Sequence, residues 1–492
     1  MQEAARRDSD VDGAKSSELS ANRFPIVVDL DDTLIVTDTL YEQIAIGLFT
    51  KPLRVVSAFA RLARGRAALK AALAHEIDLT HVELPIRQDL VHWLHEQAER
   101  GHEIHLCSAA SQPIVETVAK RLGIFASAVG SSQANLKGKS KANYLKGRFP
   151  EGFVYVGDSS ADLAVWKEAS AIVLAGTAPS VAKTARGLGK PIEAEFQNPS
   201  LSVKNFLKAL RVHHWSKNVL IFLPLILGHA WNDIPLIIHT MLAFICLLMV
   251  TSATYLLNDI ADLDADRRHW SKRNRALASG RMSIPFGFAL SGTLLVVAFL
   301  SAIIITPVFA AALGSYLVIT GSYSLGLKRI PLLDTLIIGV LFTIRLVMGI
   351  VLFSQPSPAW LLTFSVFFFF SLAVAKRHTE IVRAAVTGSH SLASRGYRVE
   401  DAPLTLTLGV SSAIASLVVL VLFIIGEMLP AHVYNHPQIL AGMPLILSIW
   451  LGRIWLLAHR GDMNDDPVSF ALRDRTSLIL GGFAALLFLA AL

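Results

Sequence analysis

The sequence predicts a protein in two parts: a doubly wound, Rossmann-like α/β domain with a helical cap, and then an all-α membrane domain of about nine transmembrane helices. Short apolar runs alternate with helical segments before residue 200, and long apolar stretches dominate after it. Only 17% of the 492 residues are charged, compared with roughly 25% in soluble proteins. These features exclude a small soluble module, a disordered protein and a disulfide scaffold.

Charge divides the chain at the same place. Residues 1–200 hold 23 Lys and Arg against 24 Asp and Glu, a net charge of −1, whereas residues 201–492 hold 22 against 14, a net of +8. Excess positive charge in the apolar half indicates basic loops at a membrane and argues against nucleic-acid binding. We therefore expect a disordered polar tail without a signal peptide at 1–23, and domains at 24–200 and 201–492.

Apolar stretches near the roughly 20 residues that span a bilayer follow residue 218. They lie near 218–232, 234–257, 285–305, 307–326, 333–354, 359–375, 404–426, 436–456 and 476–492. Lys and Arg gather in alternate loops, and this pattern places the N-terminus and the loops at 258–284, 327–332, 376–403 and 457–475 in the cytoplasm.

Polar residues follow three predicted strands in the first part. Asp29 and Asp31 follow the first apolar run, Ser108 follows Ile104–Cys107, and Asp158 follows Phe153–Val156, with Asp162 as a further candidate. The carboxyl ends of parallel strands meet at one edge, so these acids would cluster and need a cation, for which oxygen ligands favour Mg²⁺. In such a cluster Asp29 could attack a phosphoryl group, and Asp31 could move the proton.

These residues resemble the haloacid-dehalogenase-like phosphatases over residues 24–200. The resemblance covers the DxDxT loop with Thr33, Ser108, a lysine in Gly138-Lys139-Ser140-Lys141, and GDSxxD at 157–162. It implies that Asp29 is the nucleophile, that Asp31 is the acid and base, and that Ser108 and a lysine bind the phosphoryl oxygens. Lys141 fits that lysine better than Lys139. The predicted metal ligands are Asp29, Asp31 and Asp158. Asp32 stands where the family more often has glycine.

About 70 mostly helical residues separate the first two strands, and they predict a helical cap over the site at about 38–100. Residues 51–70 form a basic amphipathic stretch that includes Lys70. Two interpretations of this stretch stay open: contact with anionic lipid or the membrane domain, and an ordinary solvated cap face.

A second acidic cluster follows the second apolar span. Asn258, Asp262 and Asp266 recur at i, i+4 and i+8, with Asp259 beside them, so that they share one stripe of a helix. Arg275 follows closely in a basic segment. Carboxylates that bind Mg²⁺ beside basic side chains make a site for a diphosphate leaving group. The predicted metal ligands here are Asn258, Asp259, Asp262 and Asp266.

Residues 204–492 resemble the UbiA-type intramembrane prenyltransferases, of which NDxxDxxxD at 258–266 is the first motif. The second motif region, Tyr323 to Asp334, holds one acid where many aromatic prenyltransferases have two. The stretches at 210–218, 376–380 and 465–474 resemble the branch that transfers phosphoribose to polyprenyl phosphate. The predicted substrate-binding residues are Lys217, Asn258, Asp262, Arg275, Tyr323, Lys328, Asp334, Arg345, Lys376 and Arg377. Arg345 lies within an apolar span, where it either binds substrate or pairs with a buried acid.

Together the resemblances imply a bifunctional, Mg²⁺-dependent enzyme of the bacterial inner membrane with both active sites on the cytoplasmic side. It would transfer 5-phosphoribose from phosphoribosyl diphosphate to polyprenyl phosphate and then remove the 5-phosphate, towards a lipid-linked arabinofuranose donor for the cell wall. Two alternatives stay open. One is an aromatic prenyltransferase that uses a polyprenyl diphosphate, and the other is a membrane-anchored phosphatase whose helical part only binds lipid.

Overall fold

The computed structural model describes residues 24–131, 136–353, 359–388, 390, 392, 395–429, 434–463 and 467–492. The tail predicted at 1–23 lies outside the described residues. The chain divides into two compact units: unit 1 comprises Met1–Ala209 and Leu257–Ala289, and unit 2 comprises Leu210–Leu256 and Leu290–Leu492. The segment that carries the acidic stripe therefore belongs with the N-terminal part, whereas a single boundary near residue 200 was expected.

A six-stranded parallel sheet forms the centre of unit 1, in the order β3-β2-β1-β4-β5-β6. Its strands are β1 (Ile26–Val28), β2 (Ile104–Ser111), β3 (Ser127–Ser131), β4 (Val154–Gly157), β5 (Ala171–Ala175) and β6 (Ile192–Phe196). The chain leaves β1 towards β2 on one side and later returns to β4 on the other. The carboxyl ends of β1 and β4 thus flank the switch point where α/β proteins bind ligands.

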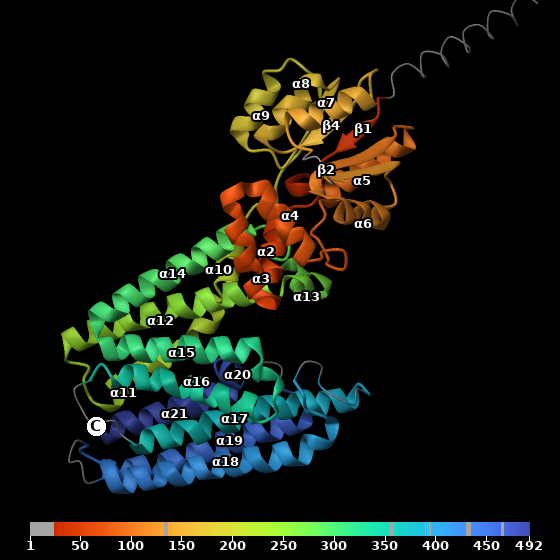
Figure 1. The fold of residues 1–492 in the computed structure, drawn as a ribbon. Helices are drawn as coiled ribbons and strands as arrows, with labels where there is room; N and C mark the ends of the chain where they lie inside the picture. The colour runs from red at the N-terminus through yellow and green to blue at the C-terminus, as the bar shows by residue number, and fades with distance from the viewer. Residues whose placement is uncertain are drawn as a thin grey trace, which may run out of the picture. The chain divides into compact units, whose positions relative to one another are not determined.

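Helices cover both faces of this sheet (Figure 1). On one face α5 (Gln88–Glu99) and α6 (Gln112–Leu122) contribute to a core with Ile26 and Val28. On the other, α7 (Lys139–Arg148), α8 (Leu163–Glu168) and α9 (Pro179–Arg186) contribute to a core with Val27 and Tyr155. Successive β1 residues enter opposite cores because side chains alternate along a strand. The predicted doubly wound α/β fold is confirmed.

The cap consists of α2 (Thr39–Thr50), α3 (Pro52–Ala60) and α4 (Arg66–Glu76). These helices share a small core of their own that includes Leu40, Val55 and Leu73. Helix α5 instead packs into the core of the sheet through Leu90 and Leu94. The cap is therefore shorter than the predicted 38–100, because the amphipathic α5 belongs to the layer that covers the sheet.

Unit 2 and the segments adjoining it are helical, and the prediction of an all-α membrane domain is confirmed. Seven helical segments among the described residues are long and apolar enough to cross a membrane. They are α12 (Ile234–Ala261), α14 (Ile284–Ile305), α15 (Pro307–Leu325), α16 (Leu333–Ile350), α17 (Ala359–Val386), and two that contain α18 (Ala402–Phe423) and α19 (Met443–Arg460). The last predicted span forms the shorter α21 (Arg475–Ala491), and the first is divided between a 3₁₀ segment at Val212–Phe222 and α11 (Leu223–Leu227).

Candidate active sites

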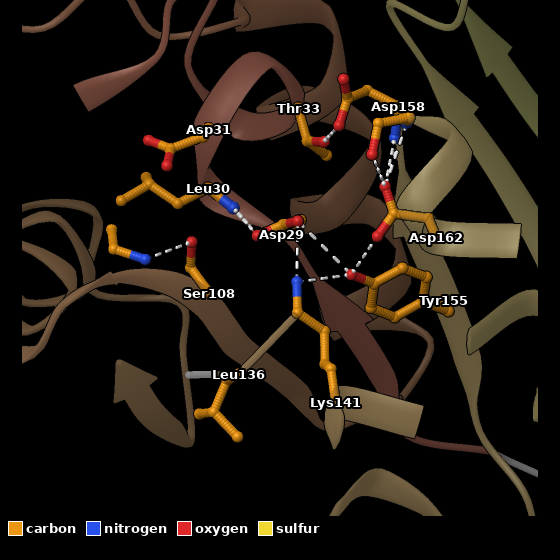
Figure 2. Close-up of polar contacts among 12 residues, drawn as sticks. Asp29, Leu30, Asp31, Thr33, Ser108, Leu136, Lys141, Tyr155, Asp158 and Asp162 are labelled. Carbon is orange, nitrogen blue, oxygen red and sulfur yellow. Dashed lines mark hydrogen bonds and ion pairs between the residues drawn. The ribbon is translucent and has the colours of Figure 1, made fainter. Parts of the chain in front are cut away.

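Asp29 lies at the carboxyl end of β1 against a buried lysine (Figure 2). Lys141, on the first turn of α7, is 2% exposed, and its Nζ lies 2.7 Å from Asp29 Oδ2. It also donates to the hydroxyl of Tyr155 at 2.9 Å. Lys139, the other candidate for this role, is exposed at the start of the same helix. This geometry supports Lys141 as the lysine of the site.

Three carboxylates form a group at the switch point. Oxygens of Asp29, Asp158 and Asp162 all lie within 4.8 Å of one another. Asp162 also orders the loop after β4, because its Oδ2 accepts from the backbone N–H groups of Asp158 and Ser159 at 3.2 and 3.0 Å. Thr33 donates its hydroxyl to Asp158 at 3.2 Å. Asp162, which the sequence left as a further candidate, thus lies in the cluster, and Tyr155, a residue that the sequence reasoning missed, donates to it at 3.0 Å.

This cluster holds more negative charge than its surroundings stabilise. Burial first, and the neighbouring carboxylates of Asp162 and Asp29 next, raise the pKa of Asp158 to about 9. Burial also raises the pKa of Asp29, although Lys141 opposes the shift. Burial lowers the pKa of Lys141, but Asp29 and Asp162 outweigh it, so that its pKa lies above the ordinary value. Three carboxylates around one ammonium group fit a divalent cation with oxygen ligands, and Mg²⁺ is the usual one.

The carboxylate of Asp31 is directed to the cap. Its Oδ1 accepts from the N–H of Thr39 at 2.9 Å, and its Oδ2 lies 2.7 Å from Nζ of Lys70. Its side chain is therefore not in the three-acid group, and the geometry suits the predicted acid–base role better than the predicted role as a metal ligand. Lys70, which was expected on a lipid-facing or solvated basic face, instead enters the site from α4. Sequence spacing carries no signal of that through-space contact.

The cluster opens into a cavity of about 590 Å³, the phosphatase pocket. Its lining includes Asp29, Asp31, Lys70, Ser108, Lys141 and Asp158. Ser108 is 1% exposed, and its hydroxyl accepts from the N–H of Ala110. Asp32 also lines the pocket and has φ 56°, a left-handed conformation that glycine adopts more easily. The family's preference for glycine here thus has a local physical reason.

The acidic stripe retains its predicted spacing. Helix α12 ends at Ala261, but the N–H of Asp262 donates to Asn258 O at 3.0 Å, and the N–H of Asp266 donates to Asp262 O at 2.8 Å. Asp262 is exposed, whereas Asp259 and Asp266 are buried. Arg275 Nη1 lies between these two acids, 3.1 Å from Asp259 and 2.6 Å from Asp266. Within the described residues Asp259, Asp262 and Asp266 do not form a close group of three carboxylates, and the Arg275 guanidinium lies between two of them.

A buried ion pair joins the stripe's helix to the cap. Arg267, on α13 (Leu263–Arg268), donates to both carboxylate oxygens of Glu42 on α2 at 2.7 and 2.9 Å. The side chains are 5% and 0% exposed. Arg267 also donates to Glu83 O, and the Glu83 N–H donates to Asp264 at 2.8 Å. Helix α2 therefore contacts both sites: its Thr39 N–H donates to Asp31, and its Glu42 binds Arg267, the neighbour of Asp266.

Glu42→Gln is expected to loosen α13, because removing one partner of a buried ion pair costs about 3–5 kcal/mol. Amide hydrogen exchange at Leu263–Arg268 should accelerate by roughly a hundredfold or more. Arg268→Gln is the matched control, since Arg268 is half exposed and pairs with Asp264 near the surface. Equal exchange in the two variants would contradict a stabilising role for the buried pair.

In unit 2, Asp334 and Arg377 bind each other. Asp334 is 0% and Arg377 2% exposed, and Arg377 Nε and Nη2 lie 3.0 and 2.8 Å from Asp334 Oδ2. Tyr397 donates its hydroxyl to Asp334 Oδ1 at 2.6 Å, and Arg377 also pairs with Glu380. Both residues were predicted to bind substrate. Their mutual pairing indicates that Asp334 holds Arg377 in place beneath the surface.

Arg345 has a different environment. It lies on α16, 8% exposed, with Nε donating to Asn218 at 2.9 Å and Nη2 donating to the Tyr316 hydroxyl at 3.1 Å. Among the residues that the structure describes, no carboxylate lies within salt-bridge distance of it. The interpretation as a pair with a buried acid is therefore not supported. A buried guanidinium with only neutral partners is a candidate for binding an anion.

The remaining predicted binding residues of unit 2 are half-buried. Tyr323 on α15 accepts from Arg395 at 2.6 Å. Lys217 lies in the 3₁₀ segment, Lys328 lies between α15 and α16, and Lys376 lies beside Arg377 on α17. Their role in substrate binding stays a prediction.

Comparison with known proteins agrees with both folds. The model of the haloacid dehalogenase-like hydrolases matches residues 26–167, and that of the UbiA prenyltransferase family matches residues 219–487. The chain belongs to the UbiA prenyltransferase family and carries a haloacid dehalogenase-like domain at its N-terminus. It is thus an enzyme of UbiA type with a hydrolase domain.

Three relatives extend this finding. The chain is 42% identical to "Uncharacterized protein y4nM" of Sinorhizobium fredii, over 96% of this chain and 91% of that protein. It is 33% identical to "Nodulation protein NoeC" of Azorhizobium caulinodans, over 58% and 92%. It is 29% identical to the decaprenyl-phosphate phosphoribosyltransferase of Mycobacterium tuberculosis, over 39% of this chain and 65% of that enzyme.

Proposed function

We propose that this protein transfers 5-phosphoribose from phosphoribosyl diphosphate to a polyprenyl phosphate and then hydrolyses the 5-phosphate. The observation that carries the proposal is the assembled phosphatase site, Asp29 with Lys141 and two further acids, in one chain with a UbiA domain. Relatives of the UbiA part include decaprenyl-phosphate phosphoribosyltransferases. Phosphoribosyl transfer leaves a phosphomonoester on the product, and that is the substrate class that such a phosphatase needs.

In the transfer step, an oxygen of the lipid phosphate attacks the anomeric carbon, and the bond from that carbon to diphosphate breaks. No strong base is needed, because a lipid phosphate is already anionic near neutral pH. Arg275 and Asp262 lie on the segment that would receive the diphosphate. Mg²⁺ at this stripe would neutralise the leaving diphosphate. The Arg275 guanidinium, which pairs with Asp259 and Asp266, would bind the diphosphate oxygens in place of these carboxylates.

In the hydrolytic step, an Asp29 oxygen attacks phosphorus, and the bond to the sugar's 5-oxygen breaks. Asp31 donates a proton to that oxygen and then takes one from the water that cleaves the aspartyl-phosphate. Lys141 and the Ser108 hydroxyl bind the phosphoryl oxygens. Thr39 and Lys70 hold the Asp31 carboxylate in position on the side of the cap. We further propose that both sites face the cytoplasm of a bacterium, as the basic loops predict.

One assay tests the proposal. Purified protein is incubated with phosphoribosyl diphosphate, polyprenyl phosphate and Mg²⁺, and the lipid products and inorganic phosphate are measured. We expect a lipid-linked pentose phosphate that then loses its phosphate, and no product when EDTA is added. A parallel incubation contains a polyprenyl diphosphate and an aromatic acid; prenylation there, with no sugar transfer in the first incubation, would instead establish the aromatic prenyltransferase. Phosphatase activity alone would establish the membrane-anchored phosphatase.

Arg345 provides a further prediction. Arg345→Met is expected to raise the KM for one anionic substrate of the transferase at least tenfold, since hydrogen bonds to charged groups contribute about 1.5–3 kcal/mol. Arg345→Lys should recover part of that loss, because it keeps the charge but not the planar fork. Phosphatase turnover of p-nitrophenyl phosphate is the control and should stay unchanged. An unchanged KM for both transferase substrates would leave Arg345 with a structural role only.

A further inference from the structure

A second cavity adjoins the phosphatase pocket in unit 1. This cavity, here called the junction cavity, has a volume of about 210 Å³ and shares Asp32, Asp38 and Tyr41 with the phosphatase pocket. Its remaining lining comes largely from Arg267 and from the segment Leu277–Pro285. Asp32 comes from the loop after β1, and Asp38 and Tyr41 come from the start of the cap, so the two cavities lie side by side at these three residues.

The lining of the junction cavity is acidic in one part and apolar in the other. Carboxylates of Asp32 and Asp38 line the part shared with the phosphatase pocket, whereas Leu277, Met282, Ile284 and Pro285 supply apolar surface. Carboxylates accept hydrogen bonds from sugar hydroxyls, and the apolar side chains suit a hydrocarbon. The lipid-linked product of the proposed transfer has its sugar in the middle, a phosphodiester after the sugar and a hydrocarbon at its end, and Arg267 is the cationic residue in this lining.

The apolar part of the cavity lies where the chain enters a membrane helix. Ile284 and Pro285 are the first two residues of α14, a candidate membrane span, and α12, the preceding span, ends at Ala261. The lining from Arg267 to Pro285 thus belongs to the connection between two spans, which lies at the surface of a bilayer. A lipid chain in the membrane can reach this place while its head group extends outward.

The walls of the junction cavity are fixed by buried contacts. Arg267 is held by Glu42, as described above. Gly280 has φ 73°, and a Cβ atom there would lie 2.9 Å from the carbonyl oxygen of Val36, so only glycine lets the two backbones approach this closely. The cavity is therefore built by specific contacts between the cap side and the 257–289 segment, both in unit 1.

We propose that the junction cavity binds the isoprenoid end of a lipid-linked sugar phosphate while the terminal phosphate of the same molecule occupies the phosphatase pocket. The phosphatase would then select a membrane lipid over soluble sugar phosphates. This inference rests on the proposed function, because it takes the product of the transferase as the substrate of the phosphatase.

Ser283 offers a matched pair of variants to test it. Its side chain is exposed at the cavity and accepts from the N–H of Phe286 at the start of α14. Ser283→Ala removes that hydrogen bond and leaves the cavity open, whereas Ser283→Trp removes the same bond and fills the cavity. Val36→Phe, with Val36→Ala as its control, fills the cavity from the opposite wall and guards against misfolding of the first variant.

Phosphate release is measured on two substrates: p-nitrophenyl phosphate, and the lipid-linked 5-phosphoribose in detergent. We expect both filling variants to lose at least tenfold in kcat/KM on the lipid and less than twofold on p-nitrophenyl phosphate, with both alanine variants near wild type. The inference would be overturned if both filling variants kept their kcat/KM on both substrates, or lost it equally on both. Either result would leave the proposed function standing. A wild-type protein that hydrolyses p-nitrophenyl phosphate but not the lipid would overturn the proposed function as well.

Discussion

Asp29→Asn is expected to abolish phosphate release while sugar transfer continues. The substitution replaces the carboxylate that attacks phosphorus and removes the anionic partner of Lys141. Loss of a nucleophile typically lowers kcat by at least about a thousandfold. The transferase residues lie elsewhere in the chain, so a lipid-linked pentose phosphate should accumulate. Thin-layer separation of radiolabelled lipid products measures both steps in one reaction.

Asp89→Asn is the matched control for this experiment. Asp89 is exposed in the first turn of α5, where it accepts from the N–H of Leu90, so the same change of charge should leave both steps near wild type. If Asp29→Asn still converted the intermediate to lipid-linked pentose, another protein or another site would be the phosphatase. If it stopped sugar transfer as well, the two activities could not be independent.

Asp262→Asn is expected to have the complementary effect. Asp262 is the exposed member of the acidic stripe, and removing its charge should weaken Mg²⁺–diphosphate binding and lower the rate of sugar transfer roughly a hundredfold, since a metal contributes several kcal/mol to such a step. Hydrolysis of p-nitrophenyl phosphate by the same preparation should remain within twofold of wild type. Initial rates at saturating lipid phosphate measure the effect.

Asp264→Asn is the matched control, because it removes a carboxylate from the same segment but not from the stripe. Asp264 lies two residues further on, off the stripe, where it accepts from the Glu83 N–H and pairs with Arg268. An asparagine oxygen can still accept that N–H bond, and we expect transfer to change little. Similar losses in the two variants would mean that the segment contributes only net negative charge, which would contradict a specific diphosphate site.

The sequence predicted the fold class well where a pattern is local. Three of the six strands were recognisable as apolar runs that end in Asp, Ser or Gly-Asp, and the membrane helices as long apolar stretches between basic loops. Strands β3, β5 and β6 were not singled out, although β3 also ends in a serine, Ser131, that lines the pocket. The first and last membrane spans differ from the prediction because hydropathy records apolar length and not the breaks that divide residues 212–227 between a 3₁₀ segment and a short helix.

Site residues were predictable when they belong to a motif, and not when they act from a distance. Asp29, Lys141 and Asp158 lie together as the motifs indicated. Lys70 contacts Asp31 from a cap helix and Tyr155 contacts Asp162 from a strand, and no spacing in the sequence shows these contacts. Asp334 and Arg377 show the reverse case. Their residue types suggested two ligands for substrate, but complementary charges in a buried place bind each other first.

Unit 1 takes its parts from two separate passes of the chain, and this affects how the protein can be divided for study. A fragment that ends near residue 200 would lack residues 257–289 and would leave the Glu42 carboxylate without its guanidinium partner. A fragment that begins there would carry Arg267 without its acid. Expression of either half alone is therefore a poor assay of that half, and gene truncation would confuse loss of a neighbour with loss of chemistry. Full-length point variants are the sounder genetic tool.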